Sequence, residues 1–355
     1  MWKVELWYVH LIKLKNTLLN FILMEKTIQI GINGFGRIGR TLFRLLINHP
    51  TIKVKIINDI SDAHTLCHLL KYDSIHGVLH EEIKSANNSI SVANQSIRFS
   101  SEKNIKKIDW GNLDFVIECS GKYKTRKQLL NHINNGAKKV ILSVPPQDES
   151  IKMVVVGVND SIVNTEDKII SNASCTTNNS APMLQIINDL CGIKQAYITT
   201  VHSYTTDQSL HDQPHRDLRR ARAASQSIVP TTTGAAKALT KIFPELENVI
   251  GGCGIRVPVP NGSLTDITIN AKKEVSITEI NNAFKNASET RFKNILQYTE
   301  DPIVSVDIKG NNHSCIFDSG MTSSIGKMIK IIGWYDNEVG YSSRIIDLIH
   351  LVSKK

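Results

Sequence analysis

Three glycines stand near the start of the chain, where a strand-like segment gives way to a helix-like one. The segment TIQIGIN alternates residues that favour strands, and the apolar residues of 41–48 recur with helical spacing. Gly34, Gly36 and Gly39 between them fit the pattern G-x-G-x-x-G. Glycine lets the turn tighten and lets a ligand approach the backbone, and the helix N-terminus that follows favours negative charge. The turn therefore predicts a phosphate-binding loop within a βαβ unit.

A second strand-like segment, VKIIND, ends in Asp59, 20 positions after Gly39. A carboxylate at this spacing accepts hydrogen bonds from the adenosine ribose hydroxyls and repels a 2′-phosphate, so it favours NAD over NADP. The alternative is a βαβ unit whose glycine turn is merely structural. Further strand-like segments, LDFVIECSG and AKKVILSVPP, predict an α/β fold with a Rossmann-type doubly wound parallel sheet that binds its ligand at the carboxyl edge.

The pattern changes after residue 173. Segments QAYITTVHSY, CGIRVPVP and SLTDITINAKKEV are strand-like and follow one another more directly, with one helix-like segment, TEINNAFKNAS. They predict an α+β catalytic domain with a mixed or antiparallel sheet. We therefore expect an NAD-binding domain over 24–173 and a catalytic domain over 174–339. Residues 340–355 have helical spacing and are expected to pack back on the first domain.

Residues 1–23 are more apolar than the rest, but Lys13 and Lys15 interrupt them. They fit neither a secretory signal nor a membrane span, which needs about 18 or more uncharged apolar residues. Arg and Ser, which a transit peptide would need, are scarce in them. We interpret this segment as an N-terminal extension, either disordered or read from a misplaced start.

The composition limits the kinds of partner. Six cysteines are spread without CxxC pairs or zinc-type spacing, so we expect no metal site and a reducing, cytoplasmic location. The net charge of +9 is carried by scattered lysines that form no long basic run with interleaved aromatic residues. We therefore expect no specific nucleic acid and no membrane as partner; a basic face for anionic small molecules fits equally well.

One cysteine stands in an unusual place. The segment SNASCTTNNSAP sets Cys175 among Asn, Ser and Thr, and APMLQIINDLCG after it is helix-like, with Pro182 in its first turn. The thiol would lie near a helix N-terminus, where free N–H groups and the helix dipole stabilise a thiolate. The alternative is a cysteine that merely fills the start of a helix.

A cysteine nucleophile beside a dinucleotide suggests aldehyde oxidation. Addition of the thiolate gives a tetrahedral hemithioacetal that can expel hydride and become an enzyme thioester. His202, at the end of a predicted strand and flanked by hydroxyls, is the candidate base; an ordinary strand-end histidine is the alternative. Arginines and hydroxyls suited to phosphate surround it in the sequence: Thr205, Arg219, Arg220, Arg222, the PTTTG turn and Arg256.

Seven segments, in this order along the chain, carry a family resemblance: NGFGRIGR, SNASCTTN, HSYTTDQ, DLRRARAA, PTTTGAAKAL, RVPVPN and WYDNEVGYSSR. In these segments the chain resembles the phosphorylating glyceraldehyde-3-phosphate dehydrogenases over essentially its whole length from Met24. The resemblance implies NAD-dependent conversion of D-glyceraldehyde 3-phosphate and inorganic phosphate to 1,3-bisphosphoglycerate, a step of glycolysis and gluconeogenesis. It also implies a homotetramer in which a loop from about Tyr204 to Ser227 reaches the cofactor of a neighbouring subunit.

The resemblance implies a full set of site residues, with Cys175 as nucleophile and His202 as its activator and base. Substrate and phosphate are implied to lie among Ser174, Thr176, Thr205, Asp207, Arg219, Thr233, Gly234 and Arg256. The cofactor is implied to lie among Gly34, Gly36, Arg37, Ile38, Gly39, Asp59, Lys103, Ser143 and Asn337.

Three departures from the family pattern keep alternatives open. Asn179 stands where the family usually has a second cysteine, so we expect altered sensitivity to oxidation with activity retained. Gln213 replaces the Leu that is common before Pro214 in NAD-specific members, so the expected preference for NAD over NADP is weaker. The segment ASQSIVP resembles the corresponding segment of a sister enzyme, erythrose-4-phosphate dehydrogenase. Oxidation of erythrose 4-phosphate is therefore the alternative activity. A catalytically silent nucleotide-binding protein is the alternative of another class, although Cys175, His202 and Arg256 are all present.

Overall fold

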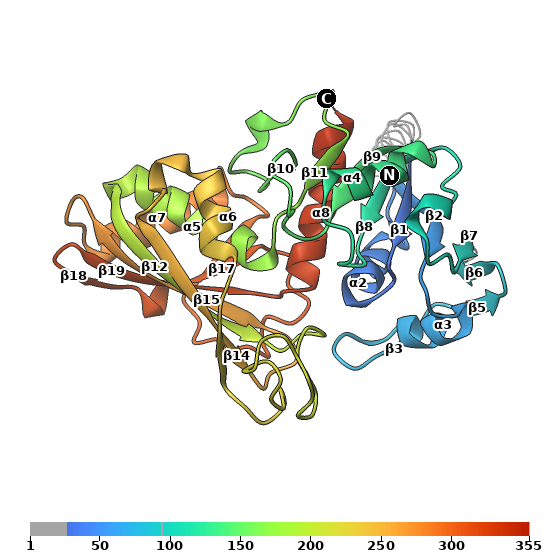
Figure 1. Ribbon diagram of the computed structural model, residues 1–355. Coiled ribbons are helices and arrows are strands. Elements are labelled where there is room, and N and C mark those ends of the chain that lie inside the picture. Colours follow the sequence, from blue (N-terminus) through green and yellow to red (C-terminus); the bar gives the residue numbers. More distant parts are fainter. Residues whose placement is uncertain (1–26, 94, 355) are drawn as a thin grey trace, which may run out of the picture.

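A nine-stranded sheet carries the glycine turn. The computed structural model describes residues 27–93 and 95–354 (Figure 1). Neighbouring strands are parallel from β10 to β7, and only the β7-β6-β5 edge is antiparallel. The predicted doubly wound parallel sheet is therefore confirmed. In spatial order the strands are β10 (Lys152–Met153), β11 (Ile169–Ser171), β9 (Ala137–Leu142), β8 (Leu113–Glu118), β1 (Ile28–Asn33), β2 (Ile52–Asn58), β7 (Gln95–Ser100), β6 (Ser89–Val92) and β5 (Ile83–Ala86).

Helices pack on this sheet because each buries one apolar face. In α2, the helix after the glycine turn, Leu42, Phe43 and Leu46 are buried in the first core. The C-terminal helix α8 contributes Ile345 and Leu348 to the same core, and Figure 1 shows it in red beside the blue and teal elements. The helices here are α2 (Arg37–Leu46), α3 (Ala63–Lys71), α4 (Arg126–Asn134) and α8 (Val339–Ser353), with the short pair β3 (Tyr72–Asp73) and β4 (Gly77–Val78) after α3.

A second, eight-stranded sheet is mixed, as the sequence predicts. β12 pairs in parallel with β14 and in antiparallel with β15, and helices α5, α6 and α7 cover one face (Figure 1). Its strands are β12 (Ile193–Ser203), β13 (Val229–Thr231), β14 (Ile250–Val257), β15 (Ser263–Ala271), β16 (Leu296–Thr299), β17 (Cys315–Asp318), β18 (Ser323–Ile325) and β19 (Met328–Tyr335). The helices are α5 (Cys175–Cys191), α6 (Ala235–Ile242) and α7 (Ile277–Glu289). Short 3-10 helices occupy Ile105–Lys107, Asp160–Ile162, Pro244–Leu246 and Ser319–Met321. In the part of the chain that is described, no helix is long and apolar enough to cross a membrane.

Helix α5 begins earlier than the sequence predicts. Cys175 is its first residue, and Pro182 lies inside the helix instead of in its first turn. The Ser174 hydroxyl accepts a hydrogen bond from the Thr177 N–H at 3.1 Å and so caps the helix at this earlier point. Proline inside the helix forfeits one N–H bond, but nearly all of the surrounding turns are buried in the second core. Because α5 begins earlier than predicted, the thiol lies closer to the helix N-terminus than predicted.

The glycine turn is held by close backbone contact. Gly34 has φ of +91°, and a Cβ there would lie 2.6 Å from the Ser120 backbone. A Cβ on Gly39 would lie 2.3 Å from the Gly34 carbonyl oxygen, whereas Gly36 has no atom within 4 Å. Two of the glycines are therefore required by the fold, and the third leaves open space beside the start of α2.

These contacts predict effects of different size for two alanine substitutions. Gly34→Ala strains the turn and pushes it off Ser120, so we expect a loss of about 2 kcal/mol or more in the free energy of unfolding. Gly36→Ala has room and a negative φ, so its effect should stay within about 1 kcal/mol. Guanidinium unfolding of both variants measures this; equal losses would show that the contact with Ser120 is not what constrains the turn.

Candidate active site

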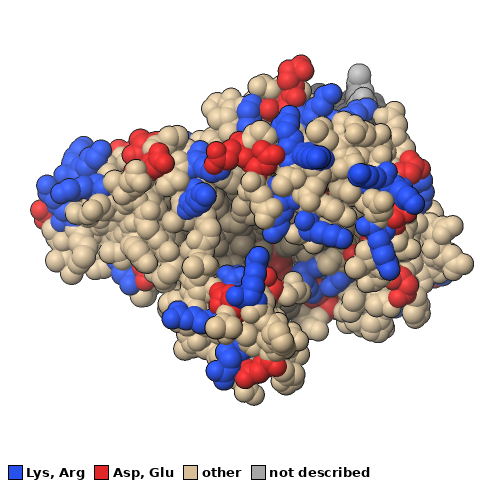
Figure 2. All heavy atoms as spheres, viewed as in Figure 1, with Lys and Arg blue, Asp and Glu red and all other residues tan. Residues whose placement is uncertain are grey.

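The predicted nucleophile and base meet although they are 27 residues apart in the chain. Cys175 begins α5 and His202 lies near the end of β12, and the Cys175 Sγ is 3.5 Å from the His202 Nε2. Both line a cavity of about 340 Å³. Figure 2 shows the surface hollowed between the two parts of the molecule, with Lys and Arg side chains and some Asp and Glu side chains around the hollow. The Lys and Arg side chains suit anionic ligands.

The tautomer of His202 follows from its other ring nitrogen. Nδ1 lies 2.7 Å from the Ser203 carbonyl oxygen and 2.8 Å from the Nη1 of Arg256. The Ser203 carbonyl oxygen accepts from Arg256 at 2.9 Å and can also accept from a proton on Nδ1, since a carbonyl has two lone pairs. In this tautomer Nε2 carries no proton. It faces the thiol as an acceptor, which is the arrangement a general base requires.

Burial governs the protonation of this pair. It lowers the pKa of His202 to about 3, with the nearby charge of Arg256 acting in the same direction. Burial also raises the pKa of the Cys175 thiol, while Arg256 and the Thr176 N–H lower it in part. The helix terminus does favour the thiolate as predicted, but burial outweighs it. Burial therefore works against charge on either member of the pair.

Two sets of buried contacts around the Cys175–His202 pair were not predicted from the sequence. The Tyr335 hydroxyl hydrogen-bonds the hydroxyls of Thr176 and Thr200, each at 2.9 Å, and its ring meets His202 edge to face. Asn179, in place of the expected cysteine, donates to the carbonyls of Gly333 and Trp334 and ties α5 to β19. Only the position of Tyr335 in the WYDNEVGYSSR segment could have indicated its role.

Cys175 lies between two spaces suited to anions. The 340 Å³ cavity continues past the thiol to Thr205, and a second cavity of about 190 Å³ adjoins it on the other side. Both cavities are lined by Ser174, Cys175, His202 and Arg256, and the second one also by Thr176, Thr233 and Gly234. All of these residues were predicted from the sequence. Hydroxyls, a glycine backbone and a guanidinium are the groups that bind phosphate.

Arg219 and Asp207 do not line either cavity. The Arg219 side chain is exposed, and Arg220 takes the predicted place in the 190 Å³ cavity. The turn decides this, because the Arg219 N–H donates to Asp217 at 2.9 Å while the Arg220 Nε donates to the Thr231 hydroxyl at 2.9 Å. Asp207 pairs with the Arg220 guanidinium and reaches the cavity only through it.

The predicted cofactor residues divide between two cavities that meet at the glycine turn. One, of about 370 Å³, is lined by Gly34, Gly36, Asp59 and Lys103. The 340 Å³ cavity is lined by Arg37, Ile38, Ser143 and Asn337. Gly39 lines neither and acts through its contact with Gly34. This division suits a ligand with two ends and a pyrophosphate between them.

The start of α2 fits a pyrophosphate. Gly36 at its N-cap offers no side-chain hydrogen bond, and the first turn holds no acidic residue. The N–H groups of this turn and the positive end of the helix dipole are therefore left for an anion. Asp59 accepts from the Phe35 N–H at 2.6 Å and the Ser61 N–H at 2.9 Å, which fixes its carboxylate beside the turn. The residues present thus fit a dinucleotide.

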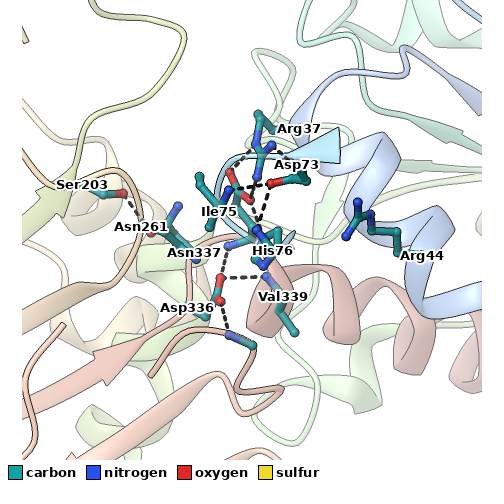
Figure 3. Close-up of polar contacts among 12 residues, drawn as sticks. Arg37, Arg44, Asp73, Ile75, His76, Ser203, Asn261, Asp336, Asn337 and Val339 are labelled. Atoms are coloured by element: carbon teal, nitrogen blue, oxygen red, sulfur yellow. Dashed lines mark hydrogen bonds and ion pairs between the residues drawn. The ribbon is translucent and has the colours of Figure 1, made fainter. Parts of the chain in front are cut away.

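The Arg37 side chain does not face this anion site. It points toward Asp73, at 2.6 Å (Figure 3), and its guanidinium also pairs with Glu338, at 2.5 Å. Glu338 also contacts His76 at 2.7 Å. Only the backbone of Arg37 is therefore free to meet a phosphate, as the resemblance implies. Glu338, next to Asn337 in the sequence, joins the starts of α2 and α8 and was not identified from the sequence.

Asn337 is oriented by two hydroxyls. Its Oδ1 accepts from Ser203 at 2.9 Å and from Ser263 at 3.0 Å. An amide whose oxygen is occupied in this way presents its Nδ2 as a donor. Because Asn337 lines the 340 Å³ cavity together with Cys175, this donor is placed to hold a carboxamide oxygen there.

The charge of Arg256 gives a test of the thiol's environment. Arg256→Gln removes a positive charge that lowers the pKa of Cys175, so this pKa should rise. A higher pKa means less thiolate at a given pH, and the pH midpoint of iodoacetamide alkylation should move upward. Arg219→Gln, which removes an exposed charge, is the control and should leave the midpoint in place. An unmoved midpoint in the Arg256 variant would contradict this electrostatic role.

Comparisons with known proteins agree along the chain. The family model "Glyceraldehyde 3-phosphate dehydrogenase, NAD binding domain" matches residues 28–126, and the corresponding C-terminal domain model matches residues 174–337. A Bacillus subtilis protein named glyceraldehyde-3-phosphate dehydrogenase 1 is 46% identical over 332 residues, 92% of this chain and 99% of that relative. Glyceraldehyde-3-phosphate dehydrogenase of Borreliella burgdorferi is 48% identical over 336 residues, 92% of this chain and 100% of the relative. The resemblance that the motifs indicate is confirmed.

Proposed function

The chain belongs to the glyceraldehyde-3-phosphate dehydrogenase family, and on this premise we propose how Cys175, His202 and the two anion cavities carry out its reaction. It is an NAD-dependent enzyme that converts D-glyceraldehyde 3-phosphate and inorganic phosphate to 1,3-bisphosphoglycerate. The observation that carries the proposed mechanism is a thiol that lines two cavities with phosphate-type lining groups and lies 3.5 Å from the Nε2 of His202.

The first step needs a base that is neutral at rest. As the Cys175 sulfur attacks the aldehyde carbon, the His202 Nε2 takes the thiol proton and passes it to the new hydroxyl, which gives the hemithioacetal. The backbone N–H of Cys175, at the start of α5, stabilises the developing oxyanion, an effect worth about 3 kcal/mol per donor. His202 then removes the hydroxyl proton as the hemithioacetal carbon loses hydride, and a thioester of Cys175 remains.

NAD, when bound, supplies the hydride acceptor, and Asn337, Ser143 and the start of α2 are the residues that would hold it on this side. Asp59, Gly34, Gly36 and Lys103 would hold its adenosine end.

The second half of the cycle releases the product. Inorganic phosphate attacks the thioester carbon, the Cys175 thiolate leaves, and His202 returns a proton to it. We assign the substrate's own phosphate to Thr205 and Arg256. We assign the attacking phosphate to Ser174, Thr176, Thr233, Gly234 and Arg220, with Asp207 acting through its ion pair with Arg220.

A direct assay tests the assignment of two anion sites. NADH formation by the purified protein should proceed with glyceraldehyde 3-phosphate at a rate that depends strongly on inorganic phosphate, because phosphate must cleave the thioester. Erythrose 4-phosphate is the competing substrate. Faster turnover of the tetrose without a phosphate requirement would move the chain to the sister activity, and no turnover of either would favour a catalytically silent binding protein.

Arg220 lines the 190 Å³ cavity in place of the predicted Arg219, and this difference gives a second test. Arg220→Ala removes a charged donor from the 190 Å³ cavity, so the KM for inorganic phosphate should rise by about tenfold or more. Arg219→Ala removes an exposed side chain of the same type and should change that KM by less than about twofold. Steady-state kinetics at varied phosphate concentration measure both KM values. A larger rise in the Arg219 variant than in the Arg220 variant would show that Arg219 binds the attacking phosphate.

We further propose a cytoplasmic homotetramer. The loop of residues 204–227 carries two strongly exposed apolar side chains, Leu210 at 61% and Leu218 at 82%, which supports its contact with a neighbouring subunit. Six free cysteines support a reducing compartment. We place the domain boundary near residue 173, which is supported by the end of the first sheet at Ser171 and the start of α5 at Cys175. The predicted extension over residues 1–23 lies outside the described residues.

A further inference from the structure

The last residues of four neighbouring strands in the first sheet are all polar. They are Glu118 of β8, Asn33 of β1, Asn58 of β2 and Ser100 of β7, and the strand register sets them side by side. The Ser100 hydroxyl donates to Asn58 at 2.6 Å, Asn58 donates to Asn33 at 2.9 Å, and Asn33 donates to Glu118 at 2.6 Å. These four side chains form a hydrogen-bonded ladder that runs in one direction across the carboxyl edge of the sheet.

The ladder ends in a fully buried carboxylate. Besides Asn33, Glu118 accepts from the N–H of Ser120 at 2.8 Å, from its hydroxyl at 2.5 Å, and from His132 Nε2 at 2.9 Å, so four donors face two oxygens. The Trp110 indole donates to the other nitrogen of His132 at 2.9 Å. Because an indole N–H only donates, His132 is neutral and carries its proton on Nε2, toward Glu118. Three of these donors, the Asn33 amide, the Ser120 N–H and the His132 Nε2–H, are fixed as donors, so both Glu118 oxygens serve as acceptors.

The ladder ties together the loops that form the 370 Å³ cavity. Ser120, held by Glu118, is the residue against which Gly34 packs. Asn58 exchanges hydrogen bonds with the backbone of Glu102, accepting from its N–H at 3.0 Å and donating to its carbonyl at 3.1 Å. The Asp59 N–H in turn donates to the Ser100 carbonyl. Gly34, Asp59, Glu102 and Ser120 all line this cavity.

The ladder is separate from the chemistry. Asn33 and Asn58 line the 370 Å³ cavity, Glu118 and Ser100 lie behind it, and none of the four lines the cavity that holds Cys175 and His202. We propose that the ladder of Ser100, Asn58, Asn33 and Glu118 is a positioning network that holds the loops of this cavity in the shape that binds the adenosine end of the cofactor. The assignment of that end rests on the proposed function.

Glutamine cannot replace Glu118 in this network. Its amide has one accepting oxygen and one donating nitrogen, so in either orientation the nitrogen faces at least one group that only donates, the Ser120 N–H or the His132 Nε2–H. We expect Glu118→Gln to raise the Kd for NAD, and the KM for NAD, by about tenfold or more, while kcat and the KM for glyceraldehyde 3-phosphate change by less than about twofold. A merely structural lesion would not separate these parameters.

Two further variants protect the test against misfolding. Asp318→Asn is the matched control, since Asp318 is a buried carboxylate of the second sheet that accepts from the Trp334 indole at 3.0 Å. It should lower stability without changing the Kd for NAD. Ser100→Ala, at the far end of the ladder, should raise that Kd by a smaller factor, about threefold. Combined with Glu118→Gln, its effect should fall short of the product of the two, because both variants break one chain.

Calorimetry with NAD and with ADP-ribose, which lacks the nicotinamide, is the experiment. Both ligands should lose affinity for the Glu118 variant by the same factor, with circular dichroism showing that the variants are folded. Unchanged affinity in folded Glu118→Gln, or an equal loss in Asp318→Asn, would overturn the proposal. Failure of the wild-type protein to bind NAD at all would instead contradict the proposed function.

Discussion

The contact between Cys175 and His202 requires two hydrophobic cores to meet. Cys175 packs against the core of the first sheet, whereas the rest of α5 is buried in the core of the second, and His202 comes from a strand of the second sheet. The residue before the helix cap, Ala173, holds a φ of +54° and its carbonyl accepts from Tyr341 of α8. The thiol is thus fixed where both sheets, the start of α5 and the start of α8 come together.

Burial at this meeting point sets the chemistry. Burial disfavours both a charged imidazole and a thiolate there, since it lowers the pKa of His202 and raises that of Cys175. Arg256, whose own pKa is lowered first by burial and then by the charge of Arg220, supplies the nearby positive charge for both the thiolate and an anionic substrate. On the cofactor side, the Arg37 guanidinium is paired with the carboxylates of Asp73 and Glu338. The N–H groups at the start of α2 therefore remain to bind the pyrophosphate.

Sequence reasoning locates residues at the cavities where a site depends on a short segment. The glycine turn, Asp59, Cys175 and His202 each stand in a local pattern of strand, turn and helix, and the structure places them at the cavities that those patterns predict. It failed where one residue of a loop must be chosen, because only the turn at Asp217 decides that Arg220, and not Arg219, faces inward. It could not find the ladder either, since residues 33, 58, 100 and 118 meet only through the register of four strands.

The central claim is that the reaction passes through a thioester on Cys175 that inorganic phosphate releases. Intact-protein mass spectrometry of the enzyme mixed with glyceraldehyde 3-phosphate and NAD in phosphate-free buffer tests it most directly, with peptide mapping to locate the adduct. We predict one phosphoglyceroyl group per chain on Cys175, which requires NAD and disappears when phosphate is added. Turnover without an adduct on Cys175, or an adduct on another residue that phosphate discharges, would contradict the mechanism.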